Sequence, residues 1–414
     1  MNMNKKIFIT TIALAATVAT AMAQGSSEAI NRILQQVEAN NKELKANQQL
    51  VNAQKLENRS GNNLGNPSIS YSHLWDSKDK DKTVGEMVVS QSFDFPTLYV
   101  SRSKMNRFKA EALDAQAIAL RQQVLLQAQE AALDIIWLHQ QQLLLDERLK
   151  NAEELAALYR KRLETGDANI LETNKVNLEL LNARTEARTN STNLHNKLKE
   201  LTLLNGSMPL TPGRSMREGE VPQPQALGLT EYPAMPLPEE FNRLCDELLA
   251  GDPRLRAVLH QSEAARREVS VSKQGWLPQL EVGYRRNTES GHPLNGVVVG
   301  MSFPLFENRG KVKAAKAQAL NADYQRENTE LQAKSALWQL YDEATALQAS
   351  LREYREAFAR QQDLKLLKQA LTGGEISMIE YFVEVSVVYQ SQQNLLALEN
   401  QYQKVMARLY QSRL

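Results

Sequence analysis

Residue types that usually carry catalysis or hold a metal ion are sparse in this sequence. Cys245 is the only cysteine, so neither a disulfide within the chain nor a cysteine-based zinc site is possible. The five histidines lie far apart, at positions 73, 139, 195, 260 and 292. The sequence contains no HExxH, Walker A, GxGxxG or GxSxG motif. We therefore expect no enzymatic activity, no cofactor and no metal site.

The one pattern of chemically active side chains that occurs twice is a glycine turn with carboxylates beside it. The turn glycines are Gly166 in the first copy and Gly373 and Gly374 in the second. The carboxylates beside them are Asp167 and Glu172 in the first copy, and Glu375 and Glu380 in the second. Glycine lets a chain reverse without a steric penalty from Cβ, so we expect a reversal at both places.

The long segments on either side of these turns are predicted to be helical. No proline lies within 97–208 or 305–414, and a proline inside a helix costs roughly 3 kcal/mol. Apolar residues recur there with the heptad spacing of coiled coils. They are Leu138, Leu145, Ala152 and Tyr159 in the first segment, and Val388, Leu395, Tyr402 and Leu409 in the second. Two helical hairpins are therefore predicted, over 97–205 and 309–413.

The two halves of the chain match each other in order and spacing. The Phe-Pro pair at 95–96 corresponds to the one at 303–304, and the same offset carries Gly166 onto Gly374. Such self-similarity indicates two structural repeats, each with a helix, a strand hairpin and a helical hairpin. The predicted order is a first repeat over 24–206, an irregular connector over 207–238 with seven of the 13 prolines, and a second repeat over 239–414.

Strand-like alternation of apolar and polar residues is confined to 67–95 and 278–304. Each run is roughly nine to eleven residues long, which is the length of a membrane-crossing strand. Two amphipathic hairpins packed on helices in a soluble α+β protein would show the same pattern. Four strands cannot close a barrel around water, and lipid does not tolerate an open sheet edge. Spanning strands would therefore need several chains, and three chains would supply about 12 strands.

The N-terminus is predicted to be a secretory signal over residues 1–23. Lys5 and Lys6 precede an apolar run, and residues 21–23 (Ala-Met-Ala) match a small-x-small cleavage site. The run is short for a spanning helix. The formal net charge of +1 gives no reason to expect a nucleic-acid partner.

With these features in this order, the chain resembles the TolC-type outer-membrane efflux proteins over residues 26–412. The matching pieces are Phe303-Pro304-Leu305-Phe306 followed by Gly310, strand openings at Pro67 and Pro278, a helix opening at Asp252-Pro253-Arg254-Leu255, and the two Gly-x5-Glu turns. The resemblance implies a mainly α chain with long coiled-coil helical hairpins and four transmembrane strands. In a homotrimer these would form a 12-stranded β-barrel in the outer membrane of a Gram-negative bacterium and an α-helical tunnel in the periplasm.

The implied function is the exit duct of a tripartite efflux pump or a type I secretion system, which passes small molecules or other cargo from the periplasm to the exterior. The implied partners are a periplasmic adaptor protein, an inner-membrane transporter and outer-membrane lipid. A periplasmic coiled-coil scaffold without channel activity stays open as the alternative. Whichever function holds, Glu172 and Glu380 could also simply face water on a helix, without any role in an aperture.

The resemblance also assigns roles at the helical tips. In the family, carboxylates near the tips line the periplasmic aperture, which makes Glu172, Glu380, Asp167 and Glu375 candidate aperture residues. The tips meet the adaptor, which makes Gly166, Gly373 and Gly374 candidate contacts. Leu371 and Ile376 stand where the best-known member has an aromatic residue and an arginine that tie the aperture shut. A closed state of this chain would therefore need a different lock.

Overall fold

The computed structural model describes residues 26–75, 77–78, 83–211, 221–289, 292–359 and 363–414. The predicted signal at 1–23 and part of the predicted connector lie outside these ranges. The chain forms two compact units. Of the described residues, those within 26–45, 120–248 and 335–414 form the first unit, and those within 46–119 and 249–334 form the second. Each unit therefore contains parts of both predicted repeats.

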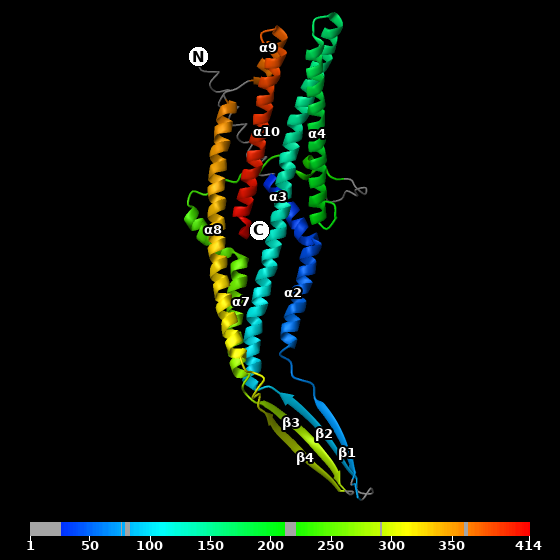
Figure 1. Cartoon of the computed structure of the whole chain (residues 1–414), viewed down its shortest axis with the longest axis vertical. Helices are drawn as coiled ribbons and strands as arrows, with labels where there is room; N and C mark the ends of the chain where they lie inside the picture. Colours follow the sequence, from blue (N-terminus) through cyan, green and yellow to red (C-terminus); the bar gives the residue numbers. More distant parts are fainter. Residues whose placement is uncertain (1–25, 76, 79–82, 212–220, 290–291, 360–362) are drawn as a thin grey trace, which may run out of the picture. The chain divides into compact units, whose positions relative to one another are not determined.

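The second unit contains a four-stranded antiparallel sheet. Its strands are β1 (Ser68–Trp75), β2 (Thr83–Phe93), β3 (Gln279–Glu289) and β4 (His292–Ser302), in the spatial order β1-β2-β3-β4 (Figure 1). The two hairpins lie within the predicted ranges. Pairing of β2 with β3 joins them, with Val89 opposite Tyr284. This order leaves β1 and β4 as the two edge strands.

One face of the sheet is apolar and exposed. Ile69, Val89, Tyr284 and Val297 stand in one cross-strand row. The β4 residues Val297 and Val299 are 75% and 76% exposed. An uncovered apolar face of this kind marks an interaction or membrane surface.

The opposite face of the sheet carries most of its polar and small residues. The Ser68 and Ser90 hydroxyl oxygens lie 2.9 Å apart across β1 and β2. The Arg285 Nε lies 2.7 Å from the Glu86 carboxylate across β2 and β3. The alternation predicted from the sequence is therefore confirmed in its main pattern, although Val88 lies opposite Arg285 on this face and Arg286 lies opposite Met87 on the apolar face.

The helices of the second unit begin where local sequence signals place them. α7 (Pro253–Gln274) has Pro253 in its first turn, and the N-cap Asp252 accepts a hydrogen bond from the Arg254 N–H at 2.8 Å. α3 (Pro96–Thr165) begins directly after β2. Asp94 accepts hydrogen bonds from Arg102 at 2.6 Å and from Gln279 at 3.0 Å, which connects the start of α3 to β3. α2 (Lys42–Ser60) and the first part of α8 (Lys311–Ala359) complete this unit.

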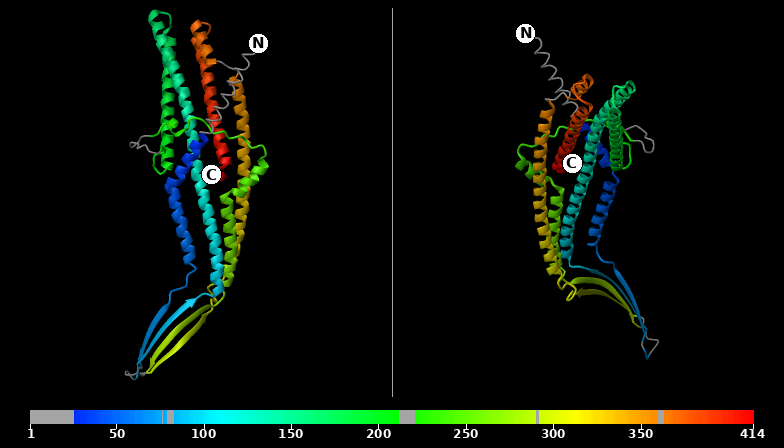
Figure 2. Two further views of the ribbon diagram at one scale, coloured as in Figure 1. Left: turned by 180° about the vertical axis from the view of Figure 1, so that it is seen from behind. Right: turned by 45° about the horizontal axis from the view of Figure 1, so that its top comes forward.

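The first unit consists of long helices that fold back on one another. α4 (Ile170–Leu204) runs back along the second part of α3, and α10 (Met378–Leu409) runs back along α9 (Asp363–Gly373) (Figure 2). Short helices α5 (Pro224–Leu227) and α6 (Phe241–Gly251) and the helical residues 26–40 lie around them. The main core gathers apolar side chains from α3, α4 and residues 30–37, among them Ile33, Val37, Leu133, Ile136 and Leu201. No helix in the described ranges combines the length and the hydropathy that crossing a bilayer requires.

The predicted heptad stripe is confirmed in α3 and only partly in α10. Leu138, Leu145, Ala152 and Tyr159 are all buried. In α10, Tyr402 and Leu409 are buried, but Val388 and Leu395 are only half-buried. Nearer the tip the buried side chains are Tyr381, Val385 and Tyr389, because this part of α10 packs on α3, α4 and α9.

A buried charged cluster joins three helices of the first unit. Asp134 on α3 is 8% exposed and accepts hydrogen bonds from the Lys404 Nζ at 3.0 Å and the Asn400 amide at 2.9 Å, both on α10. Lys197 on α4 lies 3.4 Å from the same carboxylate. The residue at the matching position of the second repeat, Asp342, is exposed. The two repeats therefore share a path of the chain but differ in what they bury.

Candidate functional site: the two helical tips

The turn between α3 and α4 is closed by backbone hydrogen bonds from a left-handed glycine. Gly166 has φ 80°. Its N–H donates to the Leu163 carbonyl at 3.3 Å, and the Asp167 N–H donates to the Arg162 carbonyl at 2.7 Å. These two bonds form a Schellman motif, which satisfies the last carbonyls of a helix and favours glycine at its left-handed position.

The turn between α9 and α10 has the same geometry. Gly374 has φ 77°, its N–H donates to the Leu371 carbonyl at 3.2 Å, and the Glu375 N–H donates to the Ala370 carbonyl at 2.9 Å. Gly373 is the last residue of α9 and is not left-handed. The expectation that Gly373 shares in the reversal was therefore wrong: Gly374 makes it alone, because only one residue of a Schellman motif requires positive φ.

Glu172 and Glu380 each close a capping box at the start of the returning helix. The Asn169 side chain accepts from the Leu171 N–H at 2.7 Å, and the Asn169 N–H donates to the Glu172 carboxylate at 3.1 Å. In the second tip the Ser377 hydroxyl accepts from the Glu380 N–H at 3.2 Å, and the Ser377 N–H donates to the Glu380 carboxylate at 2.8 Å. Each carboxylate therefore satisfies a backbone donor of its own helix.

Asn169 and Ser377 are the N-cap partners of Glu172 and Glu380, and the sequence analysis missed them. The signal for them is present, since a Ser, Thr, Asn or Asp three residues before a Glu marks a capping box. Asn169 and Glu172 have this spacing, and so do Ser377 and Glu380.

The tip carboxylates differ in their surroundings. Hydrogen bonding from Ser377, first from its backbone N–H and second from its side chain, lowers the pKa of Glu380 below its ordinary value. Glu380 is therefore ionised at neutral pH, at a helix N-terminus that favours negative charge. Asp167 and Glu375 are both exposed, and Asp167 accepts a hydrogen bond from the Thr165 hydroxyl at 2.8 Å. By contrast, Glu172 and Glu380 each use one carboxylate oxygen to accept a hydrogen bond from the backbone N–H of the N-cap residue.

Beneath the turns, an apolar cluster holds the two hairpins together. It contains Leu155, Ala156 and Tyr159 of α3, Val176 of α4, Leu371 of α9, and Met378, Tyr381, Val385 and Tyr389 of α10. Leu371 is 5% exposed, and Ile376 packs against the cluster. Leu371 and Ile376, which stand where the best-known member has its lock, therefore pack within the chain's own apolar cluster. An ion pair between Lys368 and Glu154, at 2.5 Å, also connects the hairpins.

The family model described as "Outer membrane efflux protein" matches residues 244–412, which cover almost all of the second repeat. No curated protein sequence is significantly similar to this chain.

Solved structures of membrane proteins share the fold over almost the whole chain. A crystal structure of CusC, described as forming a transmembrane channel, has a TM-score of 0.74 at 16% identity and covers 93% of this chain and 92% of its own. The outer membrane protein VceC from Vibrio cholerae has a TM-score of 0.73 at 15% identity, with 92% and 95% covered. A membrane protein from Pseudomonas aeruginosa has a TM-score of 0.75 at 16% identity, with 93% and 90% covered. The chain is therefore similar to the outer membrane efflux protein family over its second repeat, and it shares its fold with these solved structures over almost its whole length.

Proposed function

We propose that the chain is an outer-membrane efflux channel in which three copies join their sheets head to tail, β4 of one copy beside β1 of the next. The observation that carries this proposal is the four-stranded sheet with two edge strands and an exposed apolar face. Edge strands have unpaired backbone N–H and C=O groups, which must be satisfied inside the membrane. Pairing between copies satisfies them without any other element.

The two faces of the sheet support this arrangement. A transmembrane barrel has an apolar outside and a polar inside. The apolar face carries Ile69, Tyr71, Met87, Val89, Leu280, Val282, Val297 and Val299. The other face carries the Ser68–Ser90 contact and the Arg285–Glu86 ion pair. A periplasmic scaffold would have no use for valines that are three-quarters exposed, so no observation favours that alternative.

The helical tips would form the periplasmic entrance. Three copies would bring Glu172, Glu380, Asp167 and Glu375 together as rings of carboxylates, which favour cations. The capping boxes fix Glu172 and Glu380 at the first turn of their helices, so their position in such a ring would not depend on a flexible rotamer. A periplasmic adaptor would dock on the turns at Gly166 and at Gly373–Gly374, and an inner-membrane transporter would supply the energy.

Native mass measurement in detergent and planar-bilayer recording test this function. We expect a trimer that conducts ions and prefers cations. Glu380→Gln removes the charge but retains the capping box, because glutamine accepts the same hydrogen bond. We expect this variant to lower cation selectivity and to leave the trimer intact. Ser377→Ala is the matched control, since it weakens the cap and retains the charge. A monomer without conductance would refute the channel, and unchanged selectivity in Glu380→Gln would remove Glu380 from the aperture.

A further inference from the structure

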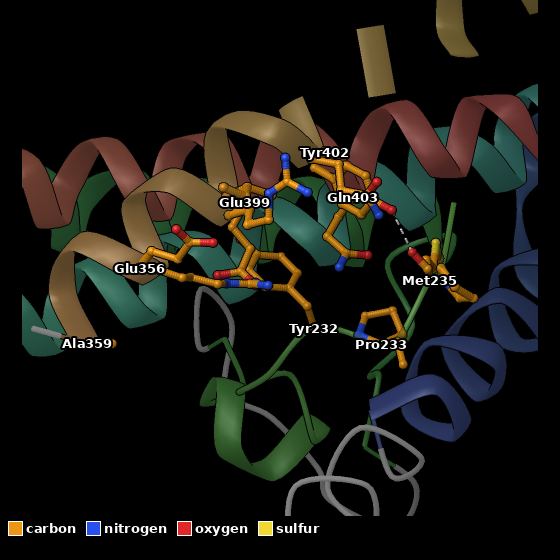
Figure 3. A pocket seen from close by; sticks show the side chains of 14 residues that line it. Tyr232, Pro233, Met235, Glu356, Ala359, Glu399, Tyr402 and Gln403 are labelled. Carbon is orange, nitrogen blue, oxygen red and sulfur yellow. Dashed lines mark hydrogen bonds and ion pairs between the residues drawn. The ribbon is translucent and has the colours of Figure 1, made fainter. Parts of the chain in front are cut away.

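A pocket of about 760 Å³ lies between the connector, α8 and α10 in the first unit. In Figure 3, Tyr232 belongs to the connector, and Glu399 and Tyr402 belong to α10. Glu399 forms an ion pair with Arg355 at 2.7 Å, and the Tyr402 hydroxyl donates to the Met235 carbonyl at 2.9 Å. Because these groups are satisfied within the chain, the lining indicates no particular ligand.

The apolar face of the sheet, by contrast, carries one charged side chain among the described residues, that of Arg286 on β3. The register places Arg286 directly opposite Met87 of β2 and Asn295 of β4, in the row that begins with Tyr71 of β1. The charged side chains on the opposite face are those of Glu86, Glu281 and Arg285. A charge that faces lipid is costly and usually serves a function, so the position of Arg286 calls for a reason.

Arg286 has no acidic partner within the described part of the chain. The residue is exposed, and no described carboxylate lies within ion-pair distance of its guanidinium. The preceding residue, Arg285, shows the contrast, because its Nε lies 2.7 Å from the Glu86 carboxylate on the other face. The guanidinium of Arg286 is therefore available to a group outside the chain.

Asn295, the residue opposite Arg286, adds a second hydrogen-bond donor. Its Oδ1 accepts a hydrogen bond from the Tyr284 hydroxyl at 2.7 Å, which leaves the Nδ2 group as the donor of this exposed side chain. Two donor groups on directly opposed residues, one of them cationic, fit an anion with several acceptor oxygens. Phosphate is such an anion, and arginine can bind it with two parallel hydrogen bonds.

Aromatic residues place Arg286 at the edge of the apolar band rather than at its middle. Trp276, ten residues earlier in the chain, and Tyr71, in the same row as Arg286, are 47% and 68% exposed. Tryptophan and tyrosine gather at the two surfaces of a membrane, and about ten residues is the length of a spanning strand. The end of β3 that leads to β4 lies away from α7 (Figure 1). With the helices in the periplasm, Arg286 would therefore lie at the headgroups of the outer leaflet, where an arginine costs far less than at mid-membrane.

We propose that Arg286 and Asn295 bind the phosphate of an outer-leaflet lipid, a phosphate monoester on the headgroup such as lipid A carries. The acyl chains of this lipid would cover the apolar residues that follow on the same face. Val297 and Val299 come next on β4 and are 75% and 76% exposed, so the chains have apolar surface to cover. This inference rests on the proposed function, because only a sheet in the outer membrane meets such a lipid.

Native mass spectrometry of the full-length protein in a non-ionic detergent tests the proposal, because one spectrum reports both the assembly and the lipid bound to it. The probes are lipid A and the same lipid with its phosphates removed. We expect the trimer to bind lipid A with an affinity about tenfold higher than that for the dephosphorylated lipid, the ratio expected from one charge-assisted contact.

Arg286→Gln should abolish this preference and leave the trimer in place, because Arg286 is exposed and has no ion-pair partner among the described residues. Arg285→Gln is the matched control, since it removes the same charge from the opposite face, and it should retain the tenfold preference. Three results would overturn the inference and leave the proposed channel intact: a wild-type trimer with equal affinity for the two lipids, a preference that survives Arg286→Gln, or a preference that Arg285→Gln removes as well. A wild-type protein that forms no trimer would instead overturn the proposed function, and this inference with it.

Discussion

The two adjacent glycines of the second tip should respond to the same substitution with opposite signs. At Gly374 (φ 77°) a Cβ would meet no atom within 4 Å, so the only cost of Gly374→Ala is the free energy of holding alanine in the left-handed conformation. That conformation costs an L-residue roughly 1–2 kcal/mol. Gly373 is helical, and a Cβ there would make one ordinary contact, 3.9 Å from the Glu375 Cγ. Gly373→Ala should therefore stabilise the tip by roughly 0.4–1 kcal/mol, because alanine restricts the unfolded chain.

Hydrogen exchange of the tip amides measures this difference without melting the assembly. The amides to follow are those of Gly374 and Glu375, which close the turn. Gly374→Ala should raise their opening constant about 5- to 30-fold, and Gly373→Ala should lower it about 2- to 5-fold. The amides of Gly166 and Asp167 in the first tip serve as an internal reference and should not change. Equal shifts in the two variants, or no shift in Gly374→Ala, would refute the assignment of the reversal to Gly374 alone.

Three further predictions concern the buried charge, the sheet and the tip carboxylate. Asp134→Asn should lower the free energy of unfolding, measured by heat or denaturant, by about 2–3 kcal/mol. The loss is smaller than for a fully buried ion pair because the lysine partners are partly exposed to solvent. Asp342→Asn should lower the free energy of unfolding by less than about 0.5 kcal/mol. Gly283→Ala should reduce the assembled fraction on native mass measurement, since a Cβ there would lie 2.7 Å from a backbone oxygen of β2, and Gly296→Ala, with nothing within 4 Å, should not. The lowered pKa of Glu380 means that its stabilisation is present above its ordinary value of 4.5 and is lost as the pH falls through the lower folded value. The opening constants of the tip amides, measured by hydrogen exchange, should therefore differ between the wild type and Glu380→Gln at neutral pH and converge in acid. A difference that stays constant across that pH range would contradict this prediction.

Patterns that are local in the sequence predicted most of the fold. Proline-free segments and heptads located the helical hairpins, and alternation located the strands, because both depend on which face a nearby residue occupies. The turns at Gly166 and Gly374 were located correctly for the same reason. The role of Gly373 was not, since composition does not say which of two glycines takes positive φ.

Features that depend on tertiary packing could not be predicted in this way. Asp134 and Asp342 look alike in the sequence, and only the packing of α3 against α4 and α10 makes one of them buried. The pocket beside Tyr232 depends on where an irregular connector lies over α8 and α10, and no periodicity encodes that path. The aperture role of the tip carboxylates depends on neighbouring copies, so it remains a prediction.

The pairing of β2 with β3 has a consequence for the order in which the chain folds. Each tip closes through hydrogen bonds between residues at most five or six positions apart, so it forms as soon as its own segment is available. The sheet must wait much longer, because the Thr288 side chain meets the Gly85 carbonyl across 203 residues of chain. Closing so long a loop is slow, and until then β2 is an unpaired edge. The interval between synthesis of the first and the second hairpin is therefore the period of greatest exposure to aggregation, and the period in which a holding chaperone would matter most.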